Sequence, residues 1–300
     1  MLGWKMVMLA LIDADIIVFR AGFAAERNVW FLSVGGADPE QFAYKREAEA
    51  RLEELLPGKY SRVEGRDFQM WSERYLEPVE NALHNARTMV EGIRDELGVT
   101  DFDVRLFMSG PNNFRYDIAK TRPYKGNRDQ AHRPTHEGAI RDYLKSIWHT
   151  EISDGQEADD LLGIALTQNP DDAILCSIDK DLRMVPGQHY DFIKKEGFVV
   201  TPDEAMSNFY RQLIIGDSTD NIVGIPNAGT ARANKLLADL PLEEQWENVL
   251  AEYASKGGEN WQDYLREQGQ LLWIRRHPGE MWEPDLQGMN WDQAEEVSMI

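Results

Sequence analysis

The chain has 300 residues, of which 42% are hydrophobic, 10% aromatic and 28% charged. These proportions are typical of a soluble globular protein with a sizeable core, and they exclude a mostly disordered chain. The net charge of −20 argues against a protein that coats nucleic acid or an anionic membrane. One cysteine, Cys176, excludes an internal disulfide and a cysteine-based zinc site. No apolar stretch approaches the roughly 18 residues of a membrane span, so we expect an intracellular protein.

Short apolar stretches predict buried strands at residues 7–12, 104–107 and 173–178. Helical periodicity and Gly, Pro or Asn stop signals predict helices at 40–56, 74–97, 138–148, 156–168, 203–216 and 230–240. Residues 108–136 are polar, basic and interrupted by Pro and Gly, and the last 60 residues are acidic and rich in Trp. Because strands alternate with helices, we expect an α/β fold with a mainly parallel sheet flanked by helices.

Acidic residues form four clusters, at Asp13 and Asp15, at Glu157, Asp159 and Asp160, at Asp179 and Asp181, and at Asp217 and Asp220. Asp13 and Asp179 follow apolar strands, so a parallel sheet would aim both at the same edge. Converging carboxylates raise one another's pKa unless a cation neutralises them. Hard divalent cations such as Mg²⁺ or Mn²⁺ suit oxygen ligands. Two such ions about 4 Å apart can activate a water and stabilise the leaving oxygen of a phosphodiester.

The clusters belong to a series of motifs, in the order Leu11–Asp15, Phe114–Arg115 with Tyr124–Arg128, Glu157–Asp160, Ser177–Asp181, and Gly216–Asn221 with Gly224–Gly229. In this order the motifs resemble the 5′-nuclease (flap endonuclease-like) family, and among its members the compact phage 5′→3′ exonucleases. The resemblance spans about residues 7–240. It implies a PIN-like nuclease core at 1–202, which includes a helical arch at about 108–136. It also implies a helix–three-turn–helix DNA-binding domain at 203–300, which ends in the acidic Trp-rich tail.

The resemblance implies two Mg²⁺ ions, for which Mn²⁺ substitutes, held by Asp13, Glu157, Asp159, Asp160, Asp179, Asp181, Asp217 and Asp220. Asp13 and Asp179 are also catalytic candidates. Family members usually carry an Asp just after the second strand, where this chain has Met108, which ligates hard cations poorly. We therefore expect one ion to be held by fewer carboxylates and more water. Asp15 lies near the family position but not on it.

Residues 105–145 carry nine Lys and Arg against four Asp and Glu, so this stretch is +5 and the remainder −25. Cations that alternate with aromatic rings are typical of a groove that follows a nucleic-acid backbone. By resemblance, Lys125 and Arg128 neutralise the reacting phosphate as catalytic residues. The other DNA-binding candidates are Arg115, Arg122, Tyr124, Gly224, Gly229 and Thr230. The last three lie at a turn that would offer backbone N–H groups to a duplex phosphate. In the family this turn also holds a monovalent cation, so K⁺ is a further candidate.

The resemblance implies a Mg²⁺-dependent 5′→3′ exodeoxyribonuclease that acts on duplex DNA with a 5′ end. Flaps and RNA–DNA hybrids are further candidate substrates, as in primer removal during phage DNA replication. We expect a monomer that binds no membrane and lies in the cytoplasm, that of the host if a phage encodes it.

Two alternatives stay open. Met108 favours a DNA-binding accessory protein with a degenerate site. A haloacid-dehalogenase-like phosphatase would use Asp13 as nucleophile and Asp15 as acid and base, but Asp217 and Asp220 are one residue too close for its late motif.

Overall fold

The computed structural model describes residues 9–56, 68–127 and 133–286. By contacts the chain forms two compact units. The first contains Met1–Ile16, Glu91–His132 and Ile147–Ile300, and the second contains Ile17–Val90 and Arg133–Ser146. The predicted division between residues 202 and 203 remains a prediction.

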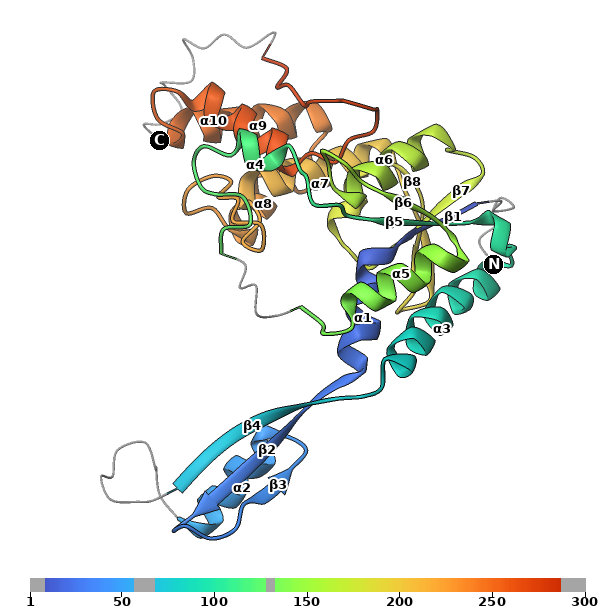
Figure 1. The fold of residues 1–300 in the computed structure, drawn as a ribbon. Helices are drawn as coiled ribbons and strands as arrows, with labels where there is room; N and C mark the ends of the chain where they lie inside the picture. Colours follow the sequence, from blue (N-terminus) through green and yellow to red (C-terminus); the bar gives the residue numbers. More distant parts are fainter. Residues whose placement is uncertain (1–8, 57–67, 128–132, 287–300) are drawn as a thin grey trace. The chain divides into compact units, whose positions relative to one another are not determined.

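The first unit is built on a six-stranded sheet of order β6-β5-β1-β7-β8-β9 (Figure 1). Its strands are β1 (Leu9–Asp13), β5 (Val104–Met108), β6 (His149–Ile152), β7 (Ala173–Cys176), β8 (Gly187–Asp191) and β9 (Glu196–Val200). All neighbours are parallel except β8 and β9. The α/β fold and the three predicted strands are confirmed. Because β1 pairs in parallel with both β5 and β7, the carboxyl ends of these strands lie at one edge.

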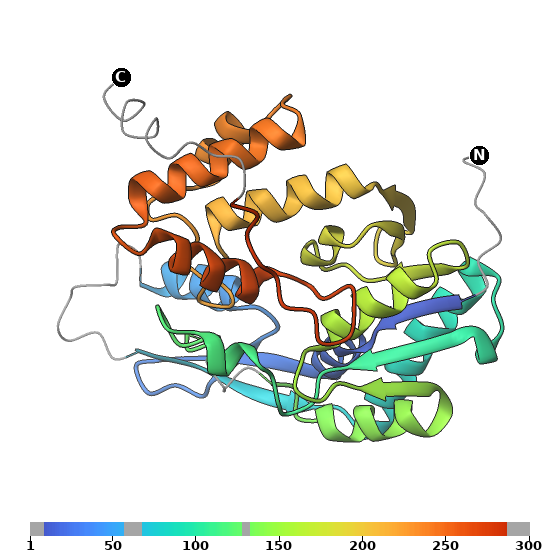
Figure 2. The ribbon, with the colours of Figure 1, turned by 90° about the horizontal axis from the view of Figure 1, so that it is seen from above.

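Helix α6 covers part of this sheet, and further helices of the first unit lie before and after it in the chain. Together these helices are α4 (Arg115–Ile118), α6 (Ala158–Gln168), α7 (Pro202–Ile215), α8 (Thr230–Leu237), α9 (Leu242–Lys256) and α10 (Trp261–Leu272). Helix α6 packs on β1, β5 and β7, while α8, α9 and α10 pack on α7, a grouping that Figure 2 shows from above. One hydrophobic core joins the sheet to these helices, since it contains Leu11 and Phe107 together with Phe209 and Tyr253.

The second unit contains an antiparallel sheet of order β3-β2-β4. Its strands are β2 (Glu26–Val34), β3 (Glu40–Phe42) and β4 (Phe68–Leu76), and the helices that lie wholly or largely in it are α1 (Ala14–Ala24), α2 (Lys45–Leu55), α3 (Val79–Leu97) and α5 (Glu137–Ile147).

Two predicted helices begin five residues later than the sequence indicated, at Lys45 and Val79 in place of residues 40 and 74. The helix predicted from residue 40 begins at Lys45, because Glu40–Phe42 pairs with β2 as a strand. The helix predicted from residue 74 begins at Val79, because the chain up to Leu76 forms β4 and Pro78 separates the two elements. Strand β4 is mostly exposed, so it lacks the apolar run that marks a buried strand.

Within the ranges that the structure describes, no helix is long and apolar enough to cross a membrane.

Candidate active site

Asp13 ends β1 and is buried, with only 3% of its surface exposed. Ser177 Oγ donates a hydrogen bond to its Oδ2 at 2.8 Å, and Ile16 N donates to its Oδ1 at 3.3 Å. Burial, followed by repulsion from Asp15, raises the pKa of Asp13 to about 7, and Asp179 adds to the rise. Asp13 and Asp179 therefore approach each other, as the sheet edge predicted.

The start of α6 brings three acids to the same place. Glu157 is the N-cap residue, and Asp159 and Asp160 lie in the first turn, where the helix dipole favours negative charge. Burial raises the pKa of Asp159 well above its usual value, and so do the charges of Asp13, Asp179 and Glu157. Asp159 therefore lies close to acids from β1, α6 and the loop after β7.

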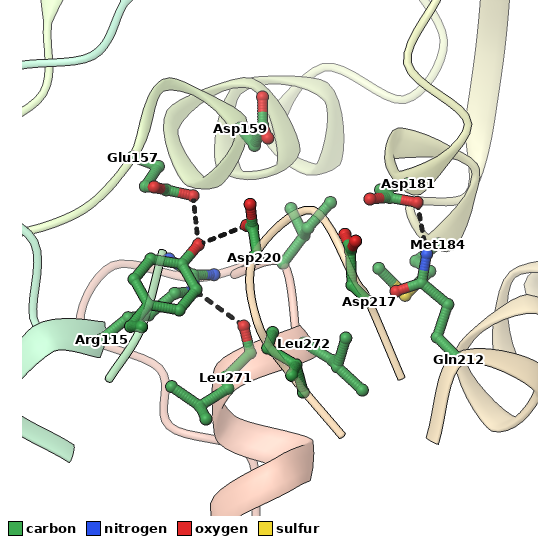
Figure 3. A pocket seen from close by; sticks show the side chains of 13 residues that line it. Arg115, Glu157, Asp159, Asp181, Met184, Gln212, Asp217, Asp220, Leu271 and Leu272 are labelled. Atoms are coloured by element: carbon green, nitrogen blue, oxygen red, sulfur yellow. Dashed lines mark hydrogen bonds between the residues drawn. The ribbon is translucent and has the colours of Figure 1, made fainter. Parts of the chain in front are cut away.

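The fourth cluster joins from the loop after α7. Burial raises the pKa of Asp181 to about 7, with further contributions from Asp179 and then Asp217. Asp217 is held by two backbone hydrogen bonds with Ile222, which close a tight loop over residues 217–222. Figure 3 shows Glu157, Asp159, Asp181, Asp217 and Asp220 around one pocket, which α10 closes from below with Leu271 and Leu272.

Gln212 lines this pocket, although the sequence motifs did not predict it. Gln212, on α7, donates a hydrogen bond from Nε2 to Asp181 Oδ1 (Figure 3). It therefore orients that carboxylate. Nothing in the spacing of Gln212 marks it, because its role depends on how α7 packs against the segment that begins at Asp181.

Asp160 and Arg115 form an ion pair with each other. Arg115 donates to both oxygens of Asp160, at 2.6 and 2.9 Å, and to the carbonyls of Leu271 and Trp273. Both oxygens of Asp160 also accept backbone N–H groups, from Glu157 and Arg275. The exposed fraction is 2% for Arg115 and 0% for Asp160. The structure therefore favours a structural ion pair over the predicted DNA contact of Arg115 and the predicted metal ligation by Asp160.

This pair also shifts the charge states of its members. Burial alone would raise the pKa of Asp160, but the charge and hydrogen bonds of Arg115 hold it below its usual value. Burial alone would likewise lower the pKa of Arg115, but Asp160 raises it. Both groups stay charged, as an enclosed and fully bonded pair must.

Tyr124 and Lys125 lie beside Glu157 and Asp220. The Tyr124 hydroxyl is 2.7 Å from Asp220 Oδ2 and 3.1 Å from Glu157 Oε2, and the ring is 4% exposed. Burial and then the charge of Glu157 raise the pKa of Tyr124 well above its usual value. The enclosed ring is not exposed for the DNA contact that was predicted for Tyr124. Arg122 is exposed, and Arg128 lies outside the described residues.

The three predicted backbone contacts at the turn between α7 and α8 differ in their exposure. Gly229 and Thr230 are exposed at the start of α8. Gly224 is buried: its N–H donates to Gln268 Oε1 at 3.0 Å and its carbonyl accepts from Tyr264. Its φ of +63° and a backbone atom 2.4 Å from where a Cβ would lie both require glycine. Gly224 therefore shapes the turn, and its N–H points into the protein.

The donors at this site suit a hard divalent cation, because they are carboxylate oxygens whose mutual repulsion such an ion would relieve. Within the described ranges, however, no three His, Cys, Asp or Glu side chains stand close enough to hold one ion together. The acids instead take local partners such as Ser177, Gln212 and Lys125. Ion binding would therefore require these side chains to move. Met108 is fully buried and contributes no ligand at the end of β5.

Comparison with known proteins places this arrangement in a context. Over 88% of its length, the chain aligns with the crystal structure of the D15 protein of phage T5, co-crystallized with metal ions. The alignment covers 88% of that protein too, at a TM-score of 0.53 and 14% sequence identity. The chain has the fold of the T5 D15 protein. A T5 5′-exonuclease mutant aligns with 89% of the chain and 84% of its own length, at a TM-score of 0.48 and 14% identity.

Sequence comparison adds one relative. Over 203 residues the chain is 30% identical to DNA polymerase I of Lactococcus lactis subsp. cremoris. The alignment covers 60% of the chain but only 23% of the polymerase, so the chain spans about a quarter of that relative. No family model matches the chain. The D15 fold and this stretch together confirm the resemblance that the order of motifs indicated.

Proposed function

We propose that this chain is a divalent-metal-dependent nuclease that hydrolyses phosphodiester bonds from the 5′ ends of duplex DNA. The observation that carries the proposal is the convergence of acids from four chain segments at the carboxyl edge of the sheet. The D15 fold supports it, and so does the stretch shared with DNA polymerase I. One of the T5 structures carries the name 5′-exonuclease and another the name flap endonuclease, in complex with DNA and metal ions.

Two Mg²⁺ ions, or Mn²⁺ in their place, are the proposed cofactors. The acids that would hold them are Asp13, Glu157, Asp159, Asp179, Asp181, Asp217 and Asp220. Such ions supply an activated water and stabilise the leaving oxygen of the phosphodiester. Asp160 is left out of this set because Arg115 and two backbone N–H groups use both of its oxygens. K⁺ at the turn between α7 and α8 stays a second, separate proposal.

The proposed DNA contacts rest on the resemblance, and for Arg122, Gly229 and Thr230 on their exposure as well. Lys125 and Arg128 are proposed to meet the charge of the reacting phosphate, and Arg122 to attract the backbone. Gly229 and Thr230, at the exposed start of α8, are proposed to donate backbone hydrogen bonds to a duplex phosphate. Such contacts carry no sequence preference. The substrate is therefore defined by its 5′ end, and the working form is proposed to be a monomer.

A cleavage assay with paired variants tests this proposal. A duplex labelled at its 5′ end is incubated with the full chain and Mg²⁺, Mn²⁺ or EDTA, beside a 5′ flap and an RNA–DNA hybrid. We expect label release only with a divalent ion, and a loss of at least about 100-fold in Asp179→Asn. Asp172→Asn is the matched control, because Asp172 is exposed and precedes β7, whereas Asp179 follows it.

The same assay separates the alternatives. DNA binding without cleavage in any metal would favour an accessory protein, for which the buried Met108 at the end of β5 is the specific observation. Hydrolysis of a small phosphomonoester that disappears in Asp13→Ala would favour a phosphatase. Cleavage that is equal in EDTA and Mg²⁺ would contradict the role of the metal.

A further inference from the structure

Lys125 lies between two of the acids that line the pocket. Its Nζ donates a hydrogen bond to Glu157 Oε1 and lies 3.8 Å from Asp220 Oδ2. The side chains of all three residues are only 15–17% exposed. An ammonium group that is shared by two enclosed carboxylates occupies the place that a metal cation would take between them.

The Tyr124 hydroxyl reaches the same two carboxylates but cannot neutralise them. It lies within hydrogen-bond distance of both Glu157 and Asp220, yet it carries one proton and donates to one acceptor at a time. Lys125 therefore supplies a positive charge between these acids.

The backbone holds the lysine in register with the loop that carries Asp220. Lys125 N donates to the carbonyl of Asp220 at 2.9 Å. On either side, Asn221 Nδ2 donates to the Pro123 carbonyl at 2.9 Å and Asn127 Nδ2 donates to the Ser218 carbonyl at 2.6 Å. Lys125 itself has a φ of +54°, which a lysine rarely adopts. These bonds fix its backbone, so that its long side chain is the part that can move.

We propose that Lys125 is the internal counter-ion of Glu157 and Asp220 in the metal-free protein, and that its ammonium leaves them when a divalent cation binds. The inference rests on the proposed function and deepens it. A divalent cation and an ammonium group compete for the same oxygens, because each is stabilised by contact with them and repelled by the other. The released ammonium stays near the pocket through its fixed backbone, where it can meet a phosphate.

The first test measures the binding of Mn²⁺ alone, without DNA, from the electron paramagnetic resonance of free Mn²⁺. We expect Lys125→Met to bind Mn²⁺ about tenfold more tightly than wild type, because the competing charged hydrogen bond is gone. In EDTA the same variant should unfold at a lower temperature, and saturating Mn²⁺ should remove that difference. Lys195→Met is the matched control, because Lys195 also has a left-handed backbone and a carboxylate partner, Glu96.

The second test needs no substitution and decides the matter if Lys125→Met fails to fold. The wild-type chain is acetylated briefly with acetic anhydride, with Mn²⁺ or with EDTA, and each lysine is quantified by peptide mass spectrometry. We expect labelling of Lys125 to rise several-fold with Mn²⁺ while that of Lys195 is unchanged.

The outcomes distinguish this inference from the proposed function. If wild type binds no Mn²⁺, both fail. Suppose instead that wild type binds Mn²⁺, but that Lys125→Met binds it no more tightly or that acetylation of Lys125 is the same with Mn²⁺ and with EDTA. The counter-ion role of Lys125 then fails and the proposed function stands.

Discussion

The ion pair of Arg115 and Asp160 shows how one enclosed contact organises the site. Arg115 leads the short helix α4, Asp160 lies in the first turn of α6, and the carbonyls of Leu271 and Trp273 come from the end of α10 and the residue after it. One guanidinium thus joins three segments behind the acid cluster. Its hydrogen bonds offset the desolvation of two buried charges.

Removing one partner of this pair should be severely destabilising. We expect Arg115→Met to lower the free energy of unfolding by about 3–5 kcal/mol, because Asp160 would be left as an unpaired buried charge. Arg133→Met is the control: Arg133 is 64% exposed in its pair with Glu137, so its loss should cost less than about 1 kcal/mol. Urea denaturation of both variants at pH 7 measures the difference. Equal losses would contradict the structural role of Arg115.

The raised pKa of Asp13 predicts how stability depends on pH without metal. The folded protein holds this proton up to about pH 7, whereas the unfolded chain releases it near pH 3.8. Between these values the folded state binds more protons, so the contribution of Asp13 to stability falls as pH rises. We expect Asp13→Asn to gain stability over wild type across this window, by up to about 1.4 kcal/mol per pH unit.

Urea unfolding in EDTA at several pH values between 4.5 and 7.5 measures this dependence. Curves for wild type and Asp13→Asn that stay parallel over the window would contradict it. Saturating Mn²⁺ should flatten or reverse the fall in wild type, because the ion stabilises the ionised carboxylate.

At the scale of elements, helix α10 fixes the turn between α7 and α8. Gln268 accepts from the Gly224 N–H and Tyr264 donates to the Gly224 carbonyl, so both backbone groups of one buried residue are satisfied by one helix. Glu267, on the same helix, accepts from the backbone of Lys120 and Thr121. The acidic C-terminal part thus holds two segments that the motifs assign to DNA binding.

This contact can be tested on the helix itself. We expect Gln268→Ala to destabilise the protein by about 1–3 kcal/mol, since the buried Gly224 N–H loses its acceptor. Gln262→Ala, on the exposed face of α10, should be neutral within about 0.5 kcal/mol. Thermal unfolding of both variants measures the stability, and fluorescence anisotropy with a labelled duplex measures binding. A loss of duplex affinity with unchanged stability would contradict the anchoring role of Gln268.

At the scale of the whole molecule, the net charge of −20 conceals a basic stretch of +5 at residues 105–145. The remainder, including a tail of net −9 over residues 241–300, repels a polyanion. The proposed attraction to DNA would therefore depend on a small number of phosphate contacts, and divalent ions at the acid cluster should strengthen it.

Salt dependence of binding checks this picture. We expect the affinity of Asp179→Asn for a duplex to fall about tenfold to a hundredfold between 50 and 200 mM KCl, which corresponds to about two to four phosphate contacts. Affinity should rise when Mn²⁺ replaces EDTA. Fluorescence anisotropy measures both effects, and binding that is insensitive to salt and to metal would contradict them.

The elements that could be predicted are those whose residues carry their own signal. Strands β1, β5 and β7 are short, apolar and buried, so their composition alone indicates them. The sheet of β2, β3 and β4 was missed, because β3 and β4 are largely exposed and carry polar side chains, while β2 is buried only at Val29 and Leu32. Exposed strands are defined by pairing with distant partners, which a local pattern does not contain.

The same reasoning applies to the candidate site. Sequence by itself determined which acids follow the strands, because strand ends and carboxylates are both local features, and their order indicated the 5′-nuclease resemblance. Tertiary structure alone decided that Arg115 and Asp160 are buried against each other, that Gly224 turns its N–H toward Gln268, and that Lys125 lies between Glu157 and Asp220. Each of these contacts joins residues at least 32 positions apart in the chain. Only the packing of the folded chain therefore determines whether a charged group or a backbone N–H faces a protein partner or a ligand.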